Sequence, residues 1–126
     1  MMNTENRGVT GKVSKKAMQF VEKYEAENNR ETQDVHNQKE LGYDILSGNR
    51  KIEVKGTSRL WKFMKNHYST VPTSIKNATH LYLICNVLDE PELHIFEINK
   101  LPPEALKVYY HLCFGKAEEV KRWKDS

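Results

Sequence analysis

The stretch that decides the fold of this chain is GYDILSGNRKIEVKG, residues Gly42–Gly56, in which a turn separates two short apolar segments. Gly48-Asn49 suits a two-residue hairpin loop, because Gly and Asn tolerate the positive φ angles that such turns need. A loop of two residues or of four gives the same register, with Asp44 directly opposite Glu53. The stretch is therefore predicted to be a β-hairpin that carries one carboxylate on each arm.

Side chains alternate along a strand, so Lys55 is predicted to share a face with Glu53. The other face is apolar and can enter the core through Ile45, Ile52 and Val54. Directly opposed side chains have Cβ atoms roughly 4.5–5.5 Å apart, and like charges at that separation destabilise a sheet. Something must therefore offset the repulsion between the two carboxylates.

Two interpretations of the carboxylate pair follow. In the structural one, Lys55 neutralises the pair as a cross-strand ion pair. In the functional one, a divalent cation lies between the two carboxylates, because Mg²⁺ typically takes one or two carboxylates and leaves its other positions to water and phosphate. A lysine beside such a cation can orient or deprotonate the attacking water, or stabilise charge on the phosphate.

The composition is that of a globular chain: 126 residues, 38% hydrophobic and 29% charged. This length favours one domain, which we place at residues 12–126 after a flexible, polar tail at residues 1–11. The longest apolar run, residues 81–85, is too short to cross a bilayer, and the first residues contain no apolar signal region. Cys85 and Cys113 lack metal-ligand spacing, so we expect reduced cysteines in a cytoplasmic protein without membrane contacts.

Apolar periodicity predicts the remaining elements. A helix is expected near residues 13–29, where Val13, Ala17, Phe20, Val21 and Tyr24 recur at helical spacing. Strands are expected around 33–36, over 80–88 and over 93–99, with a helix opened by Pro102-Pro103 and a last helical piece at about 116–123. The order predicts an α/β fold, a mixed sheet with helical cover.

Positive charge is concentrated in one part of the chain. The net charge is +3, but residues 49–76 hold seven Lys or Arg against one Glu. Such a cluster can mark a polyanion-binding surface or a solvated loop. The aromatic residues interleaved with it could stack on bases or pack onto the sheet; they are Trp61, Phe63 and Tyr68. The candidate contacts to nucleic acid are Arg50, Lys51, Arg59, Lys62, Lys65 and Lys76.

Asp44, followed by Glu53-Val54-Lys55 after a hairpin and preceded by a helix with glutamates, resembles the PD-(D/E)XK nuclease superfamily. The segments AMQFVEKYE, GYDI and IEVKGT resemble more closely the NO VEIN C-terminal domain family, over roughly residues 13–100. The resemblance implies a restriction-endonuclease-like core with a mixed four- to five-stranded sheet flanked by helices. It also implies Asp44 and Glu53 as metal ligands, Lys55 as catalytic lysine, and a helix glutamate, Glu25 or secondly Glu22.

The chain departs from the family pattern in one respect. Related domains often carry an "NE"-like pair after the Glu-x-Lys strand, whereas residues 59–78 contain no acidic residue. Either that glutamate is dispensable, or this chain has diverged toward binding without cleavage.

The sequence thus favours a Mg²⁺- or Mn²⁺-dependent endonuclease acting on DNA rather than RNA. Asp44, Glu53 and the Val54 carbonyl are expected to hold the metal, with Lys55 positioning the water and Glu25 supporting the site. The basic segment 50–76 is expected to lie against the phosphate backbone. The alternative is a non-catalytic nucleic-acid-binding or protein-interaction module on the same fold. A homodimer or a separately encoded partner is compatible with either.

Overall fold

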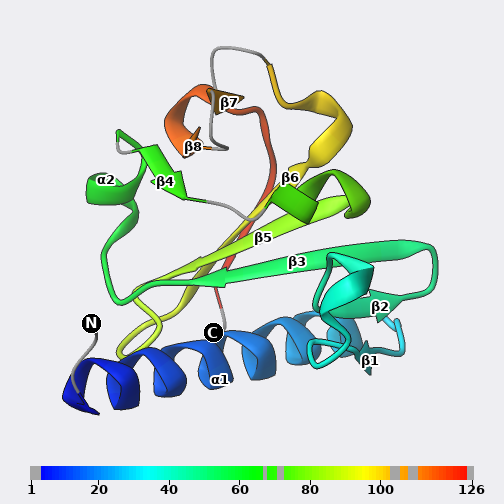
Figure 1. The fold of residues 1–126 in the computed structure, drawn as a ribbon, viewed down its shortest axis with the longest axis horizontal. Coiled ribbons are helices and arrows are strands. Elements are labelled where there is room, and N and C mark those ends of the chain that lie inside the picture. The colour runs from blue at the N-terminus through cyan, green and yellow to red at the C-terminus, as the bar shows by residue number, and fades with distance from the viewer. Residues whose placement is uncertain (1–3, 67, 71–72, 103–105, 108–110, 125–126) are drawn as a thin grey trace.

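The computed structural model describes residues 4–66, 68–70, 73–102, 106–107 and 111–124 (Figure 1). Two helices, nine strands and several 3₁₀ turns form within these ranges. In chain order they are α1 (Thr4–Glu27), β1 (Gln33–Asp34), η1 (Lys39–Leu41), β2 (Ile45–Ser47), β3 (Arg50–Gly56), α2 (Trp61–Met64), β4 (Tyr68–Thr70), η2 (Thr73–Asn77), β5 (His80–Cys85), β6 (Glu92–Glu97), η3 (Ile98–Lys100), β7 (Leu106–Lys107), β8 (His111–Cys113), η5 (Phe114–Lys116) and β9 (Glu119–Lys124).

A mixed six-stranded sheet is the centre of the fold, with strand order β1-β2-β3-β5-β6-β9. β3 and β5 run parallel, and the other neighbouring strands run antiparallel. A smaller sheet has the order β4-β8-β7. The α/β class and the mixed sheet are therefore confirmed, while the sheet has more strands than the four or five that the family resemblance implied.

The hairpin forms in the predicted register. Ile45 pairs with Ile52 across β2 and β3. Gly48 has a φ of 60° at the first loop position, where a side chain would be strained. Asp44 lies just before β2, and its peptide N–H donates to the carbonyl of Ile52 at 2.8 Å. The start of the hairpin is thereby tied to β3 beside Glu53.

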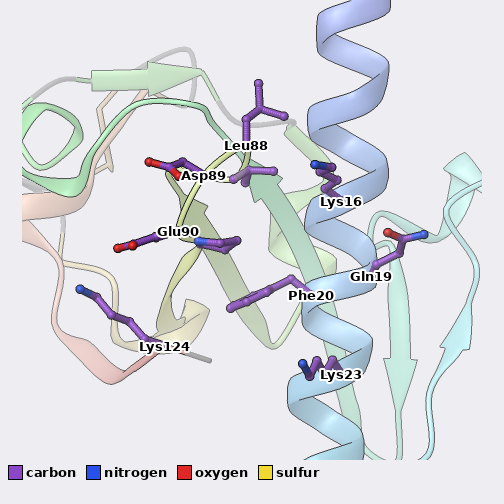
Figure 2. Close-up of a pocket in the computed structure, with 10 residues that line it drawn as sticks. Lys16, Gln19, Phe20, Lys23, Leu88, Asp89, Glu90 and Lys124 are labelled. Carbon is purple, nitrogen blue, oxygen red and sulfur yellow. The ribbon is translucent and has the colours of Figure 1, made fainter. Parts of the chain in front are cut away.

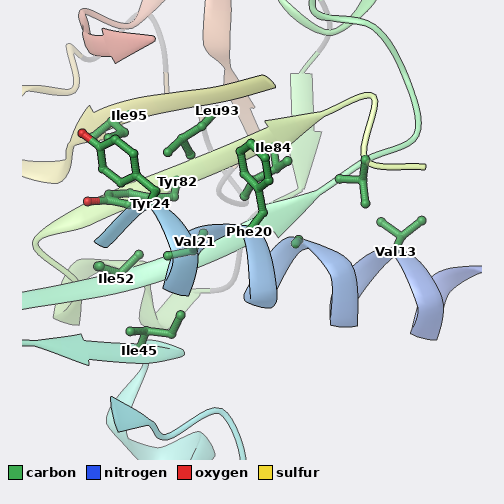
Figure 3. Close-up of a cluster of buried hydrophobic side chains, with 12 residues drawn as sticks. Val13, Phe20, Val21, Tyr24, Ile45, Ile52, Tyr82, Ile84, Leu93 and Ile95 are labelled. Carbon is green, nitrogen blue, oxygen red and sulfur yellow. The ribbon is translucent and has the colours of Figure 1, made fainter. Parts of the chain in front are cut away.

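α1 crosses one face of the sheet (Figure 1), and its predicted apolar positions are buried there. Gly56, the last residue of β3, allows the close approach, because a Cβ at this position would lie 2.7 Å from the Cβ of Ala17. The cluster that α1 forms with the sheet is drawn in Figure 3. It consists of Val13, Ala17, Phe20, Val21, Tyr24, Ile45, Ile52, Tyr82, Ile84, Val87, Leu93 and Ile95.

A second apolar cluster covers the opposite face of the sheet, beneath α2 and η2. Because side chains alternate along β5, Leu81, Leu83 and Cys85 point to this face while Tyr82 and Ile84 point to α1. Its buried members are Met64, Ile75, Leu81, Leu83, Cys85, Phe96, Leu112 and Phe114. Cys85 and Cys113 are both buried and not joined by a disulfide. The prediction that they are packing residues is confirmed.

The start of α1 differs from the prediction. α1 begins at Thr4 and not near residue 13, so the helix includes residues 4–11, which were expected to form a flexible tail. Gly8 and Gly11 lower helix propensity, but a helix already packed through Val13 and Ala17 can extend through them.

No helix within the described residues combines the length and the apolar character that a membrane span requires, and this includes α1 with its 24 residues.

The predicted C-terminal helix at residues 116–123 is wrong, because residues 119–124 form β9. Val120 and Trp123 have helical spacing, but pairing with β6 satisfies the backbone of an otherwise open sheet edge. Trp123 also packs on Phe20 and Tyr24, with ring centroids 5.0 and 5.2 Å apart. The helix expected after Pro102-Pro103 falls largely on residues outside the described ranges, and Leu106–Lys107 is strand β7.

Candidate functional site

The carboxylates of Asp44 and Glu53 lie side by side at the open end of the hairpin. Asp44 Oδ2 accepts a hydrogen bond from the Val54 N–H at 2.8 Å, which holds the carboxylate against β3. Glu53, the neighbour of Val54 in β3, approaches Asp44 closely enough for a hydrogen bond between the two side chains. Both residues are half-buried. The predicted juxtaposition of the two acids is present.

The pair binds a proton more tightly than two separate carboxylates would. Burial raises the pKa of Glu53 to about 8, the charge of Asp44 and their hydrogen bond add to the effect, and Lys55 opposes it. At neutral pH Glu53 therefore retains its proton beside the Asp44 carboxylate. A cation that binds both carboxylates would displace that proton.

Lys55 points to the same side of β3 as Glu53, as the alternation predicted. In the parallel ladder with β5, Glu53 lies beside Leu81 and Lys55 beside Leu83, so this face continues into the apolar cluster under α2. Burial lowers the pKa of the Lys55 amine, while the Glu53 charge opposes the change. A half-buried lysine of this kind gives up its proton more readily than an exposed one, and this suits a general base.

The donor set determines which metal the site can fit. Within the described residues, no three or more His, Cys, Asp or Glu side chains are grouped to hold a metal ion. Zinc sites need three or four protein ligands, whereas Mg²⁺ or Mn²⁺ can use two carboxylates with waters and substrate phosphate. The N–H and C=O of one strand residue point to the same side, so the Val54 carbonyl is directed toward Asp44 as its N–H is. This oxygen-only set fits Mg²⁺ or Mn²⁺.

Glu25, predicted to support the metal, lies on the other face of the sheet and belongs to a buried ion-pair cluster. Its carboxylate accepts two hydrogen bonds from Arg30, both 2.8 Å long, and one from the Tyr82 hydroxyl at 2.8 Å. Arg50 Nε lies 3.3 Å from Glu25 Oε1. Although burial alone would raise it, these partners lower the pKa of Glu25, whose side chain is fully buried. Glu22 is half-buried on α1, where burial and the charge of Asp34 raise its pKa.

Glu25 and Lys55 are separated because β3 presents its residues to two faces. Arg50, Ile52 and Val54 point toward α1, and Glu53 and Lys55 point away from it. A glutamate on α1 that packs on the sheet therefore meets Arg50 and not the carboxylate pair. The prediction that Glu25 completes the metal site is wrong for this geometry.

The same alternation removes Arg50 from the predicted nucleic-acid surface. Its guanidinium is held by Glu25 and contacts the hydroxyl of Tyr82, with its side chain only 26% exposed. The other five predicted basic residues have exposed side chains: Lys51, Arg59, Lys62, Lys65 and Lys76. Lys51 lies in β3 and Arg59 in the connection that follows it. Lys62 lies in α2, and Lys65 directly after that helix.

A second polar cluster, which the sequence analysis missed, lies on the α2 side of the sheet. His94 is fully buried, with Glu92 Oε1 2.9 Å from its Nε2 and Glu119 at its Nδ1. The Trp61 ring stacks on the imidazole at a centroid distance of 4.2 Å and an angle of 20°. The alternation Glu92-x-His94 indicated one shared face, but Glu119 joins it only through β9, which was predicted to be helical.

A groove of about 670 Å³ lies on the α1 side, between α1 and the turn from β5 to β6 (Figure 2). Lys16 and Lys23 of α1, the turn residues 88–90 and Lys124 of β9 border it. None of the residues predicted for the metal site lines this groove.

The fold and the site together define a mixed α/β domain with two carboxylates and a lysine on one hairpin. The family model described as "Protein NO VEIN, C-terminal" matches residues 13–96, which are 84 of the 126 residues, and the chain belongs to this family. The match includes the hairpin, α2, β5 and nearly all of β6. Comparison with curated proteins and with solved structures finds no match.

Proposed function

We propose that this domain is a divalent-metal-dependent endonuclease that hydrolyses nucleic-acid phosphodiester bonds, with DNA favoured over RNA. The observation that carries the proposal is the juxtaposition of the Asp44 and Glu53 carboxyl groups, which lie within hydrogen-bond reach of each other on the hairpin that also carries Lys55. An ordinary surface hairpin has no need of two adjacent acids whose charges repel. The arrangement matches the site of the PD-(D/E)XK nucleases that the sequence resembles, and we include a restriction-endonuclease-like core in the proposal.

Each residue has a role in this proposal. Asp44, Glu53 and the Val54 carbonyl hold Mg²⁺ or Mn²⁺, and the bound cation would neutralise phosphate charge and acidify a water molecule. Lys55 accepts the proton of the attacking water, since burial lowers its pKa. The exposed basic residues of the β3–α2 region bind the phosphate backbone with an affinity that falls as salt rises.

The direct test is cleavage of plasmid DNA with Mn²⁺ by the wild type, by Lys55→Ala and by Lys51→Ala. Lys51 is the matched control because it lies on the same face of β3 and has an exposed side chain. Removing a general base costs roughly 10²–10⁴-fold in rate, so Lys55→Ala is expected to lose at least 100-fold. Lys51→Ala is expected to weaken DNA binding modestly and to cleave at the wild-type rate when the DNA concentration is saturating.

The mechanism is wrong if Lys55→Ala cleaves as fast as the wild type. If wild type and variant bind DNA equally, do not cleave it and are unaffected by a chelator, the domain is a non-catalytic binding module. The exposed basic residues support this alternative, because they can bind phosphate groups whether or not the carboxylate pair holds a metal.

A further inference from the structure

α2 exposes two large apolar side chains side by side. Phe63 is 53% exposed and Leu60, which caps the helix, is 41% exposed. Met64 on the inner side of the same helix is buried in the cluster that covers the sheet, and Trp61 packs against that cluster. The exposed pair is therefore the outer face of a helix whose inner face is already anchored.

The structure separates the two aromatic residues of α2 by role. Trp61 stacks on the buried His94, and the Arg122 guanidinium carbon lies 5.5 Å from its ring centroid. Both contacts occupy the indole, so Trp61 holds α2 on the sheet. Within the described ranges no aromatic ring stacks on Phe63, and its described aromatic contact is with the Lys62 amine 5.1 Å from the ring centroid.

The position of Phe63 is fixed by the backbone and not by its own packing. The Met64 N–H donates to the Leu60 carbonyl at 3.1 Å. After α2, the Lys65 carbonyl accepts the Gly115 N–H at 2.7 Å and the Cys113 thiol at 3.4 Å. Only glycine fits at 115, because a Cβ there would lie 2.3 Å from the Lys65 oxygen. Because the backbone that carries the Phe63 ring is already fixed, little conformational entropy is lost when a flat ligand stacks on the ring.

The surroundings of Phe63 are cationic. Arg59, Lys62 and Lys65 have exposed side chains within seven residues of chain. The sequence contains no Asp or Glu between Glu53 and Asp89. α2 also covers the sheet face to which Glu53 and Lys55 point, and the chain reaches α2 directly from the end of β3 (Figure 1).

We propose that this exposed face of α2, formed by Leu60 and Phe63 with Arg59, Lys62 and Lys65, binds a single-stranded segment of nucleic acid by stacking a base on Phe63. A cationic surface with an exposed aromatic ring matches a strand that offers both phosphates and free base faces. A duplex buries its base faces in its own stack, and an acidic peptide offers charge without flat rings. The inference rests on the nucleic-acid substrate of the proposed function and adds that α2 binds an unpaired segment of it.

The test is fluorescence anisotropy with a labelled oligothymidine strand and a labelled, fully paired DNA duplex made of two annealed strands, both in EDTA so that no cleavage occurs. Stacking of one base accounts for a loss of roughly 5- to 150-fold on alanine substitution, so Phe63→Ala is expected to weaken single-strand binding by that factor. Phe63→Tyr keeps the ring and is expected to bind as the wild type does. Leu88→Ala, at an apolar side chain that is 40% exposed beside acidic residues of the β5–β6 turn, is the control and is expected to change nothing.

The inference is overturned if Phe63→Ala binds the single strand as tightly as the wild type, or if the wild type binds neither oligonucleotide. It is also overturned if Phe63→Ala loses affinity for the duplex, for heparin or for polyglutamate by the same factor, since none of these offers a free base face. Circular dichroism confirms that the variants fold. Because the assay needs no metal, failure of DNA cleavage leaves its result intact, and a failed Phe63 test leaves the metal site untouched.

Discussion

The carboxylate pair makes a quantitative prediction about stability. Glu53 ionises near pH 4.5 in an unfolded chain and near pH 8 in the folded protein. Between these values the folded state binds more protons than the unfolded state, so the free energy of unfolding falls as the pH rises from about 4.5 to about 8 and is level above that. Glu53→Gln removes the ionisation, and this dependence should disappear with it.

The magnitude follows from the two pKa values. Their difference of about 3.5 corresponds to about 5 kcal/mol if the site did not relax at all. Glu53 is half-buried, so water and the nearby Lys55 screen part of this energy, and we expect about 2–3 kcal/mol in measurement. At pH 9 without metal, Glu53→Gln should therefore be more stable than the wild type by this amount, and at pH 4 the two should be equal.

The assay is urea unfolding in EDTA at pH 4, 7 and 9, followed by circular dichroism. Glu90→Gln is the matched control, because Glu90 is an exposed carboxylate in the β5–β6 turn and its removal should change stability by less than about 0.5 kcal/mol. The reasoning is refuted if Glu53→Gln is less stable than the wild type at pH 9. In that event the glutamate is a structural partner of Lys55.

Addition of Mn²⁺ extends the same experiment. A ligand at 100 times its dissociation constant stabilises the folded state by about 2.7 kcal/mol, and this should be seen in the wild type alone. Because the cation displaces the proton that Glu53 holds, its effect should increase as the pH rises toward 8. If Mn²⁺ stabilises Glu53→Gln as much as the wild type, the metal binds at a site other than the carboxylate pair.

Three further substitutions test the surrounding structure. Glu25→Gln should cost about 1.5–3 kcal/mol in urea unfolding, because Arg30 and Arg50, whose side chains are 31% and 26% exposed, lose their charged hydrogen-bond partner, yet Mn²⁺ should stabilise this variant as it does the wild type. Gly56→Ala should cost about 1–3 kcal/mol, since its Cβ would lie 2.7 Å from that of Ala17, and the double substitution with Ala17→Gly should recover most of the loss. Gly115→Ala should displace the Lys65 carbonyl, seen as faster hydrogen exchange in α2; unchanged exchange would contradict the close approach described above.

The hairpin and the carboxylate pair could be predicted from the sequence because they are local. The Gly48-Asn49 turn fixes the register of strands that adjoin it, and the alternation of side chains then places Glu53 and Lys55 on one face. The apolar spacing of α1 likewise identified the face that packs on the sheet. None of these conclusions needs knowledge of distant contacts.

The errors concern contacts between distant segments. Glu25 was expected at the metal site, but which face of β3 the helix covers is settled by tertiary packing, and that face presents Arg50. Residues 119–124 have a spacing that suits a helix, and the open edge of β6 makes them a strand. The Glu92–His94–Glu119 cluster depends on that same pairing, so it could not be found before the strand was known.

The parallel pairing of β3 with β5 also orders the events of folding. Asp44 and Glu53 meet through a short loop, whereas Leu81 and Leu83 reach β3 only after the whole connection through α2 and η2 has closed. Local hairpins form in microseconds, and pairing across a long connection is slower. The two acids should therefore come together while still solvated and become desolvated only when β5 docks. A cation captured by the early hairpin would remove the charge repulsion before that slow step, so Mn²⁺ should accelerate refolding as well as oppose unfolding.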